Sequence, residues 1–318
     1  MTPRQLKYFV EIARTGSITT AAATLHIAQP ALSHHIAAME QELGVALLQR
    51  HARGVRLTAE GQRLWERAAS ILRQMERLGD DVREAGQSPR GIVRACVAGA
   101  LSSVFAVPLL QALRERAPEI QLQLTTVLSR EAQFLVETRR VDLALLPTAF
   151  QITRLEAIAL FEEDFCLFGA PQHMQGSQGP VAFRELCALP LVAPDREHDL
   201  RQLMERTALA QNCALNVLYE INQAELSRSL VYGGLAFAVL PRNAFAARDE
   251  ASVAARDIVE PRLSRIQSLA WSLDQPLTAA GKLVREVVLE LVAAMVTDGR
   301  LKGRLLAAGA LPRMGVEA

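Results

Sequence analysis

The sequence has few cysteines, and none of them is spaced for metal binding. Cys96, Cys166, Cys187 and Cys213 stand at least 21 positions apart, with no neighbouring histidine. A zinc site needs close pairs of such ligands. We therefore expect no metal site and no disulfide framework, and interpret the four cysteines as buried thiols in a reducing compartment.

Motifs of the common enzyme classes are also missing. The chain contains no G-x-S-x-G turn, no Walker loop, no G-x-G-x-x-G and no H-E-x-x-H. We expect no catalytic residue and no cofactor. An enzyme that carries a DNA-binding module stays open as an alternative, although no nucleophile or acid–base constellation supports it.

Long apolar runs and an excess of charge are lacking too. Charged or amide side chains interrupt every apolar run before the roughly 18 residues of a membrane span, and MTPRQLKYF at the start has no apolar signal region. We expect a cytoplasmic protein without a membrane partner. Because 35 Lys and Arg nearly balance 34 Asp and Glu, affinity for nucleic acid must come from local clusters.

The first sixty of the 318 residues predict a compact helical unit. Thr2, Pro3 and Gln5 form the pattern of a capping box with proline at the first helical position. Gly16 ends this helix, and Ser17 is placed to cap a second one. The expected apolar faces are Leu6, Phe9, Val10 and Ala13 on the first helix and Ile18, Ala21, Ala22 and Leu25 on the second.

A third helix is expected to begin at Pro30, after a three-residue turn. At 100° per residue, its inward face holds Leu32, Ile36, Met39 and Leu43. A second stripe is small, polar and rich in hydrogen-bond donors: Gln29, Pro30, Ser33, His34 and Ala37. Such a helix after a tight turn has the helix-turn-helix geometry that enters the DNA major groove. We expect His35 to face solvent.

Three arginines in RHARGVRLT, residues 50–58, flank Gly54. This pattern indicates a short strand-turn-strand that lies along the DNA backbone or in a minor groove. Residues 1–60 hold six basic and four acidic side chains, a surplus of two. The alternative is a solvated surface hairpin.

The stretch AAATLHIAQPALSHHIAAMEQELGVALLQRHARGVRLTAEG resembles the winged helix-turn-helix of LysR-type transcriptional regulators. Within it, HIAQPALS and LLQR resemble the nitrogen-assimilation-control subgroup. The resemblance implies DNA contacts by Gln29, Pro30, Ser33 and His34 on the recognition helix and by Arg53 in the wing. Ala28 stands where the family usually has serine, and His34 where it usually has arginine or glutamine.

A long helix is predicted to follow, from about residue 59 to 85. Its apolar residues keep a 4-3-4-3-4 spacing that faces one partner helix: Leu64, Ala68, Ile71, Met75, Leu78 and Val82. We expect this helix to pair two protomers, giving a homodimer or homotetramer. Two-fold pairing implies paired half-sites in double-stranded DNA, and LysR-type operators are similarly interrupted palindromes. A helix packed within its own domain is the alternative.

The remaining chain alternates apolar runs with amphipathic stretches, which indicates α/β structure with buried, largely parallel strands. The LysR resemblance implies an effector domain of two Rossmann-like subdomains, similar to periplasmic solute-binding proteins. The predicted fold is thus α/β and multidomain. Its expected parts are a winged helix-turn-helix (1–58), a linker helix (59–86), a hinge (87–91), an effector-binding domain (92–300) and a tail (301–318). Subdomain I covers about 92–160 and 268–300, and subdomain II about 161–267.

A small-molecule effector is expected between the subdomains. Ser102, Ser103 and Ser129 follow strands at helix starts, where hydroxyls and free amides suit an anion. They match positions where LysR-type proteins contact small acidic effectors, and Gln223 would face them from subdomain II. The alternative for these residues is ordinary helix capping. We expect His198 to be a surface loop residue, as we do Arg196. A solute-binding protein could share this fold but would have a signal peptide and no DNA-reading helix.

Overall fold

The computed structural model describes residues 1–51, 54–83, 88–147, 155–174, 179–245 and 252–306. Two compact units divide the chain, one of Met1–Ser88 with Thr138–Arg140 and one of Pro89–Glu137 with Val141–Ala318. Each unit is considered by itself. Within the described part of the chain, no helix combines the length and apolarity that a membrane crossing requires.

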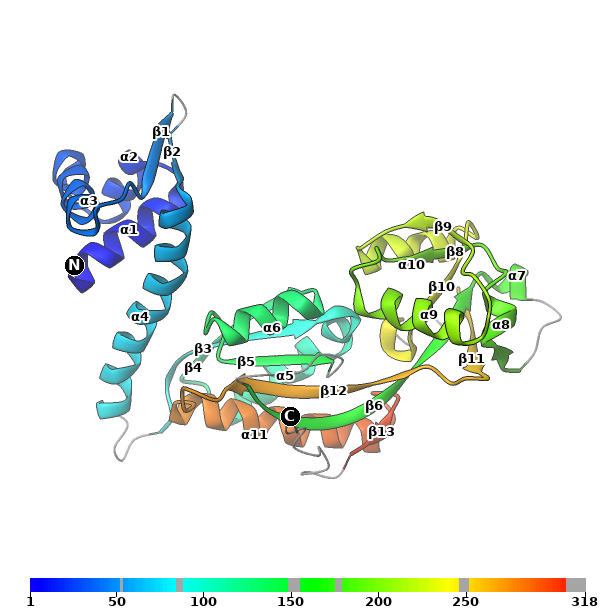
Figure 1. Cartoon of the computed structure of the whole chain (residues 1–318). Coiled ribbons are helices and arrows are strands. Elements are labelled where there is room, and N and C mark those ends of the chain that lie inside the picture. Colours follow the sequence, from blue (N-terminus) through cyan, green and yellow to red (C-terminus); the bar gives the residue numbers. More distant parts are fainter. Residues whose placement is uncertain (52–53, 84–87, 148–154, 175–178, 246–251, 307–318) are drawn as a thin grey trace, which may run out of the picture. The chain divides into compact units, whose positions relative to one another are not determined.

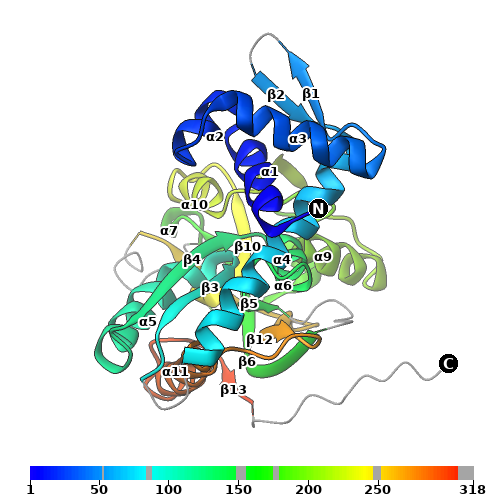
Figure 2. The same cartoon turned by 90° about the vertical axis from the view of Figure 1, so that its left-hand side faces the viewer.

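The N-terminal unit begins with three helices, α1 (Pro3–Thr15), α2 (Ile18–Thr24) and α3 (Gln29–Leu43), which surround one apolar core (Figure 2). The predicted capping box is confirmed, since the Thr2 and Gln5 side chains each accept the other's backbone N–H. Ser17 caps α2 by accepting from the N–H of Thr20. The expected inward face of α3 is wrong at Leu43, which is 40% exposed in the last turn.

A two-stranded hairpin follows, formed by β1 (Leu48–His51) and β2 (Gly54–Leu57). Gly54 has φ of 137°, and a Cβ there would lie 2.4 Å from the carbonyl oxygen of Gly16. The N–H of Val55 donates to that same oxygen at 2.9 Å. Glycine is therefore required for the hairpin to dock closely on the end of α1.

Carboxylate and hydroxyl contacts fix the hairpin at its other end. Glu40 of α3 accepts from the N–H groups of Leu47 and Leu48, at 2.7 and 3.1 Å. Thr58 caps the long helix α4 (Ala59–Arg83) by accepting from the N–H of Gly61 at 2.9 Å. These bonds hold hairpin, α3 and α4 in one rigid unit.

The C-terminal unit holds two subdomains that share long strands (Figure 1). In subdomain I the sheet contains β3 (Gly91–Ala98), β4 (Ile120–Val127) and β5 (Leu143–Pro147), which are mutually parallel, as expected. Helices α5 (Ser102–Arg116) and α11 (Ala279–Thr297) cover one face. Helix α6 (Ser129–Glu137) covers the other face (Figure 1).

Subdomain II is built on the parallel strands β8 (Leu191–Ala193), β9 (Val217–Glu220) and β10 (Phe237–Pro241). Helices α8 (Phe183–Leu186) and α9 (Asp199–Ala210) pack in one core of this subdomain, and α10 (Ala224–Tyr232) packs in another. The smaller elements of subdomain II are α7 (Pro171–Met174), β7 (Val181–Ala182) and β11 (Ala254–Val259). A further short strand, β13 (Arg304–Leu305), follows α11 and pairs with Phe161 and Glu162.

Two antiparallel strands, β6 (Leu155–Gly169) and β12 (Ser264–Ser272), join the subdomains. β6 pairs with β12 and β13 along its first part and with β10 and β11 along its last part. The register of β6 with β12 shifts between Gln267 and Ser268. The sheet is therefore mixed, because both strands that cross between the subdomains run against their neighbours.

The thiols of Cys187 and Cys213 lie together in subdomain II, with their Sγ atoms 2.9 Å apart. Spacing along the chain did not reveal this pair. Cys213 is half-buried, whereas Cys187 is buried, and burial raises the pKa of Cys187 to about 12. Attack on an oxidant near neutral pH should therefore begin at Cys213.

We expect diamide, a thiol oxidant, to link Cys187 to Cys213 and to leave the buried Cys96 and Cys166 as thiols. Peptide mapping by mass spectrometry under non-reducing conditions measures this linkage. The Cys213→Ser variant serves as the control and should yield no intrachain disulfide. Mixed pairing that includes Cys96 would contradict the described packing of subdomain II.

Candidate functional site

The predicted DNA-reading stripe lies on the exposed side of α3. Gln29, Pro30 and His34 are exposed, and Ser33 is half-buried. The opposite side of α3 is buried and faces the core: Leu32, Ile36 and Met39. Packing on α1 and α2 therefore leaves amide, hydroxyl and imidazole groups available to base edges and phosphates.

The start of α3 has no side-chain cap. Ala28 is the N-cap residue and makes no capping hydrogen bond, and a proline occupies the first turn. The first N–H groups of a helix need a partner, and a phosphate oxygen can supply one. The alanine that departs from the LysR pattern thus leaves the first N–H groups of α3 without a side-chain cap.

The expectation that His35 faces solvent is wrong. His35 is half-buried, and its ring centre lies 5.1 Å from that of Tyr8 on α1. Tyr8 is only 5% exposed, and its hydroxyl accepts from Nε of Arg4 at 2.6 Å. His35 therefore packs against α1, whereas the neighbouring His34 is exposed.

The wing is present as the β1–β2 hairpin, in which His51 pairs with Gly54. Arg53, the predicted wing contact, lies outside the described residues. Arg56, on β2, is exposed. The described part of this hairpin thus displays one basic side chain, Arg56.

A cavity of about 370 Å³ lies between the two subdomains, and we call it the effector cleft. Its walls come from β5, from the crossover strands β6 and β12, and from α9. The lining residues are Pro147, Glu162, Phe165, Asp199, Leu200, Leu203, Arg206, Ser264, Arg265 and Ile266. A cavity of this size suits a small organic molecule.

Ser129 and Asp199 connect the subdomains beside this cleft. Ser129 is 5% exposed at the start of α6, and its hydroxyl lies close enough to Asp199 on α9 to lower the pKa of that carboxyl group. Nearby, Arg130 donates to the carbonyl oxygen of Glu197 at 3.2 Å. A predicted effector residue therefore meets a partner from subdomain II that the sequence did not single out.

Burial raises the pKa of Asp199 above its usual value. The nearby hydroxyl of Ser129 and the charges of Arg130 and Arg265 offset this rise of the pKa only in part. Its Oδ2 atom is buried without a hydrogen-bond partner among the described residues. A ligand that donates a hydrogen bond to Oδ2 would remove this unfavourable arrangement.

The surface interpretation of His198 is also wrong. His198 is half-buried and caps α9, because its Nδ1 accepts from the N–H of Leu200 at 3.1 Å. Burial lowers the pKa of His198, the charge of Arg265 lowers it further, and Asp195 opposes the shift. The ring therefore stays neutral near pH 7, with Nε2 as its donor. Arg196 is exposed, as expected.

None of the four predicted effector residues, Ser129 included, lines the effector cleft. Ser102 is half-buried and donates to the carbonyl oxygen of Gly99 at 3.2 Å. Ser103 is exposed beside it. Gln223 is exposed at the N-cap position of α10 and makes no capping bond with its side chain.

A buried carboxylate lies on the crossover strands between the subdomains. Glu163 is 1% exposed and accepts from Arg265 at 2.7 Å and from Gln267 at 2.6 Å through Oε1. Its Oε2 accepts from Asn243 at 3.2 Å. Arg265 also lies over the ring of Phe165, 5.1 Å from its centre. The cleft residue Arg265 is thereby held in one orientation.

Of two charged side chains in the effector cleft, Glu162 has ion-pair and hydrogen-bond partners and Arg206 has no ion pair among the described residues. Glu162 accepts from Arg304 and Ser264, and these bonds lower its pKa. Arg206 is exposed on α9 and has no ion pair among the described residues. Arg206 is thus the cation of this cleft most open to an anionic ligand.

Among the described residues, no group of three or more His, Cys, Asp or Glu side chains could hold a metal ion.

Two family models match the chain. The model described as bacterial regulatory helix-turn-helix protein, lysR family, matches residues 3–62, and the LysR substrate binding domain matches residues 86–293. The chain belongs to the LysR family. Its domains are those of a transcriptional regulator and not of an enzyme.

Relatives resemble the chain along most of its length. The nitrogen assimilation regulatory protein nac of Escherichia coli (strain K12) is 32% identical over 93% of this chain and 97% of that protein. The protein of the same name from Klebsiella aerogenes is 32% identical over 94% of this chain and 98% of its own length. These matches agree with the subgroup resemblance seen in HIAQPALS and LLQR.

Solved structures share the fold. A variant of full-length OxyR from Pseudomonas aeruginosa has a TM-score of 0.71 at 22% identity, covering 92% of this chain and 94% of that chain. Full-length CbnR complexed with its target DNA has a TM-score of 0.68 at 23% identity, covering 92% and 99%. At these identities the likeness establishes the architecture of a LysR-family regulator.

The raised pKa of Asp199 makes a pH-dependent prediction. A carboxyl group with a raised folded-state pKa holds its proton more tightly in the folded protein, so this group costs stability as pH rises above its unfolded pKa. We expect Asp199→Asn to raise the melting temperature at pH 8 by about 2–4 °C. The difference should shrink as the pH is lowered.

Differential scanning fluorimetry between pH 5 and pH 8 measures this effect. Asp195→Asn, four positions before Asp199, is the matched control, because bonds from Asn222 and the backbone lower the pKa of Asp195. The control should not raise the melting temperature at pH 8. A melting temperature of Asp199→Asn below that of the unchanged protein at pH 8 would contradict the assigned burial.

Proposed function

We propose that the protein reads an interrupted palindrome in double-stranded DNA through Gln29, Pro30, Ser33 and His34 on α3 and Arg53 in the wing. The observation that carries this proposal is the exposed donor stripe at an uncapped helix start. The proposed division of the chain is the predicted one, with a DNA-binding domain at 1–58, a linker at 59–86, a hinge at 87–91 and an effector domain at 92–300.

The unpaired face of α4 supports dimerisation. Along the predicted seam, Leu64 and Ala68 pack on the core of the N-terminal unit. One and two turns further along, Ile71 is 43% exposed and Met75 is 46% exposed. A second copy of α4 would cover them, which favours a homodimer or a tetramer assembled from two such dimers.

We further propose a small anionic effector for the effector cleft. Arg206 and the fixed Arg265 supply positive charge, while Oδ2 of Asp199 offers an acceptor that needs a donor. An organic acid that also carries an N–H or O–H group matches both requirements. Ser129 is the predicted effector residue nearest this arrangement, because its hydroxyl lies close to Asp199. Ser102, Ser103 and Gln223 remain proposed contacts for a different position of the subdomains.

Selection from random duplexes tests the DNA-binding proposal. The purified protein is incubated with the pool at several salt concentrations, and the retained duplexes are sequenced. We expect enrichment of an interrupted palindrome. Gln29→Ala should relax the base preference and weaken specific binding by about 1–3 kcal/mol, the value of a bidentate base contact.

Gln62→Ala is the matched control, because Gln62 is exposed on α4 and contacts Glu66 within that helix. It should leave the selected sequence unchanged. Retention of no duplex at low salt would overturn the DNA-reading proposal, and an unchanged preference in Gln29→Ala would remove Gln29 from the reading face.

Replacement of Ile71 and Met75 by glutamate tests the pairing of α4. Two buried acidic side chains on each helix would repel across the seam, so we expect the double variant to sediment as a smaller species. The control changes two other exposed apolar residues, Leu209 (79% exposed) and Leu273 (56% exposed), to glutamate. Equal sedimentation of both double variants and the unchanged protein would exclude α4 as the main interface.

A further inference from the structure

A second and larger cavity, of about 660 Å³, lies on another side of the crossover strands. Phe165 lines the effector cleft, whereas Phe168 of the same strand lines this second cavity. Side chains three positions apart on a strand point to opposite faces of the sheet. The second cavity is therefore a separate space, and none of its lining residues lines the effector cleft.

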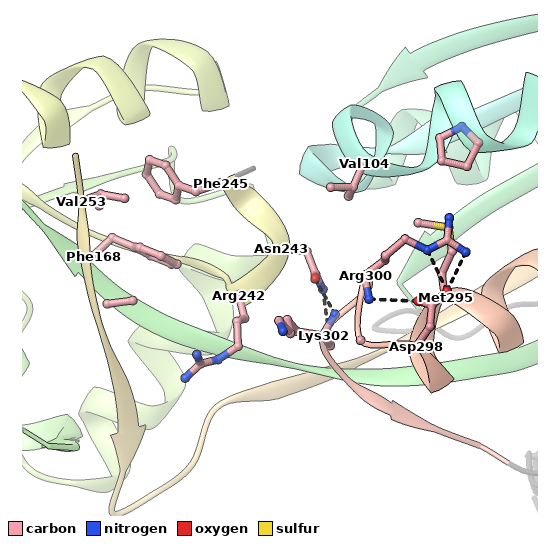
Figure 3. Close-up of a pocket in the computed structure, with 13 residues that line it drawn as sticks. Val104, Phe168, Arg242, Asn243, Phe245, Val253, Met295, Asp298, Arg300 and Lys302 are labelled. Atoms are coloured by element: carbon pink, nitrogen blue, oxygen red, sulfur yellow. Dashed lines mark hydrogen bonds and ion pairs between the residues drawn. The ribbon is translucent and has the colours of Figure 1, made fainter. Parts of the chain in front are cut away.

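One wall of the second cavity is apolar and belongs to subdomain II (Figure 3). The rings of Phe168 and Phe245 lie 4.6 Å apart between centres, and Val253 lies beside them. All three are less than 10% exposed, so their positions are set by the core of subdomain II. Across the cavity, Val104 and Met295 come from α5 and α11 of subdomain I (Figure 3).

Three basic side chains line the same cavity, Arg242, Arg300 and Lys302 (Figure 3). Arg242 is paired with Asp257, and Arg300 is paired with Asp298 at 2.7 Å. Lys302 has no side-chain hydrogen bond or ion pair among the residues that the structure describes. Among the three basic side chains that line this cavity, Lys302 is therefore the one without an ion pair in the described part of the chain.

The backbone of Lys302 is nevertheless held firmly in place. Asn243, itself 5% exposed, donates to the carbonyl oxygen of Lys302 at 2.8 Å and accepts from its N–H at 2.7 Å. The same amide group donates to the buried Glu163. An exposed lysine is usually only a solvated surface group, but the backbone of Lys302 is anchored at the edge of a cavity that has one aromatic wall.

We propose that the second cavity binds an organic anion with an aromatic or other bulky apolar body, separately from the effector cleft. The anionic group would pair with Lys302, and the apolar body would lie against Phe168, Phe245 and Val253. Residues of both subdomains line this cavity. A molecule bound there contacts both subdomains, and it favours the arrangement of the subdomains in which it can make both sets of contacts.

Titration of the full-length protein with 4-phenylbutyrate, followed by ligand-observed NMR, tests this proposal. Its uncharged amide, 4-phenylbutanamide, is the control ligand. We expect the acid to bind and the amide to bind about tenfold more weakly, because one charge-assisted contact is lost. Lys302→Ala should weaken the acid by a similar factor and leave the amide unchanged.

Two matched variants locate the bound probe. Lys282→Ala removes another exposed lysine, at the opposite end of α11, and should leave binding unchanged. Arg206→Ala removes the unpaired cation of the effector cleft and should also leave it unchanged. No binding by the unchanged protein, equal binding of acid and amide, or full binding by Lys302→Ala would each overturn the proposal. Loss of binding in Arg206→Ala would place the probe in the effector cleft instead, which overturns the second site and leaves the proposed effector cleft standing.

Discussion

The buried carboxylate of Glu163 is the constraint on which the C-terminal unit depends. An ionised carboxylate away from water is stable only when donors surround it. Arg265 and Gln267 supply donors from the facing crossover strand, and Asn243 supplies one from the end of β10. Asn243 also clamps the segment after α11 through Lys302. One buried charge thus orders residues that line both cavities.

The two cavities therefore depend on the same buried carboxylate, although no residue lines both of them. Arg265 lines the effector cleft and bonds Glu163, whereas Asn243 lines the second cavity and bonds the same carboxylate. Displacement of either donor leaves a buried charge less satisfied, which raises its free energy. Movements of the two subdomains about β6 and β12 therefore have to preserve these hydrogen bonds or replace them.

The sequence predicted the N-terminal unit well because its structure is set by local patterns. The capping box at Thr2, the cap at Ser17 and the hairpin around Gly54 each depend on residues a few positions apart. The errors have physical causes. Leu43 lies in the last turn of α3, which extends beyond the apolar core, so its side chain is exposed. His35 contacts Tyr8 of α1, and the periodicity of α3 alone does not reveal a contact between two helices.

The effector region could be predicted only as a class of structure. Its cleft combines residues near positions 147, 162, 199 and 265, and no local spacing brings them together. Ser129 was predicted from its position at a helix start. Its proximity to Asp199 could not be predicted, because it depends on how the two subdomains pack. His198 sits in a polar stretch that indicates a loop, and its role as a helix cap depends on where α9 begins. The Cys187 and Cys213 thiols meet for the same reason, through tertiary packing over 26 positions.

The buried carboxyl group of Asp199, close to Ser129, bears on which ligands the proposed effector cleft would favour. Oδ2 of Asp199 is buried and has no hydrogen-bond partner among the described residues, and this arrangement is energetically unfavourable. A ligand shifts an equilibrium only by its different affinity for the two states. Under the proposed effector binding, a ligand whose donor reaches Oδ2 of Asp199 favours the subdomain arrangement in which that contact forms. A ligand that offers an anion alone gains no such contact, and its effect must come from Arg206 and Arg265.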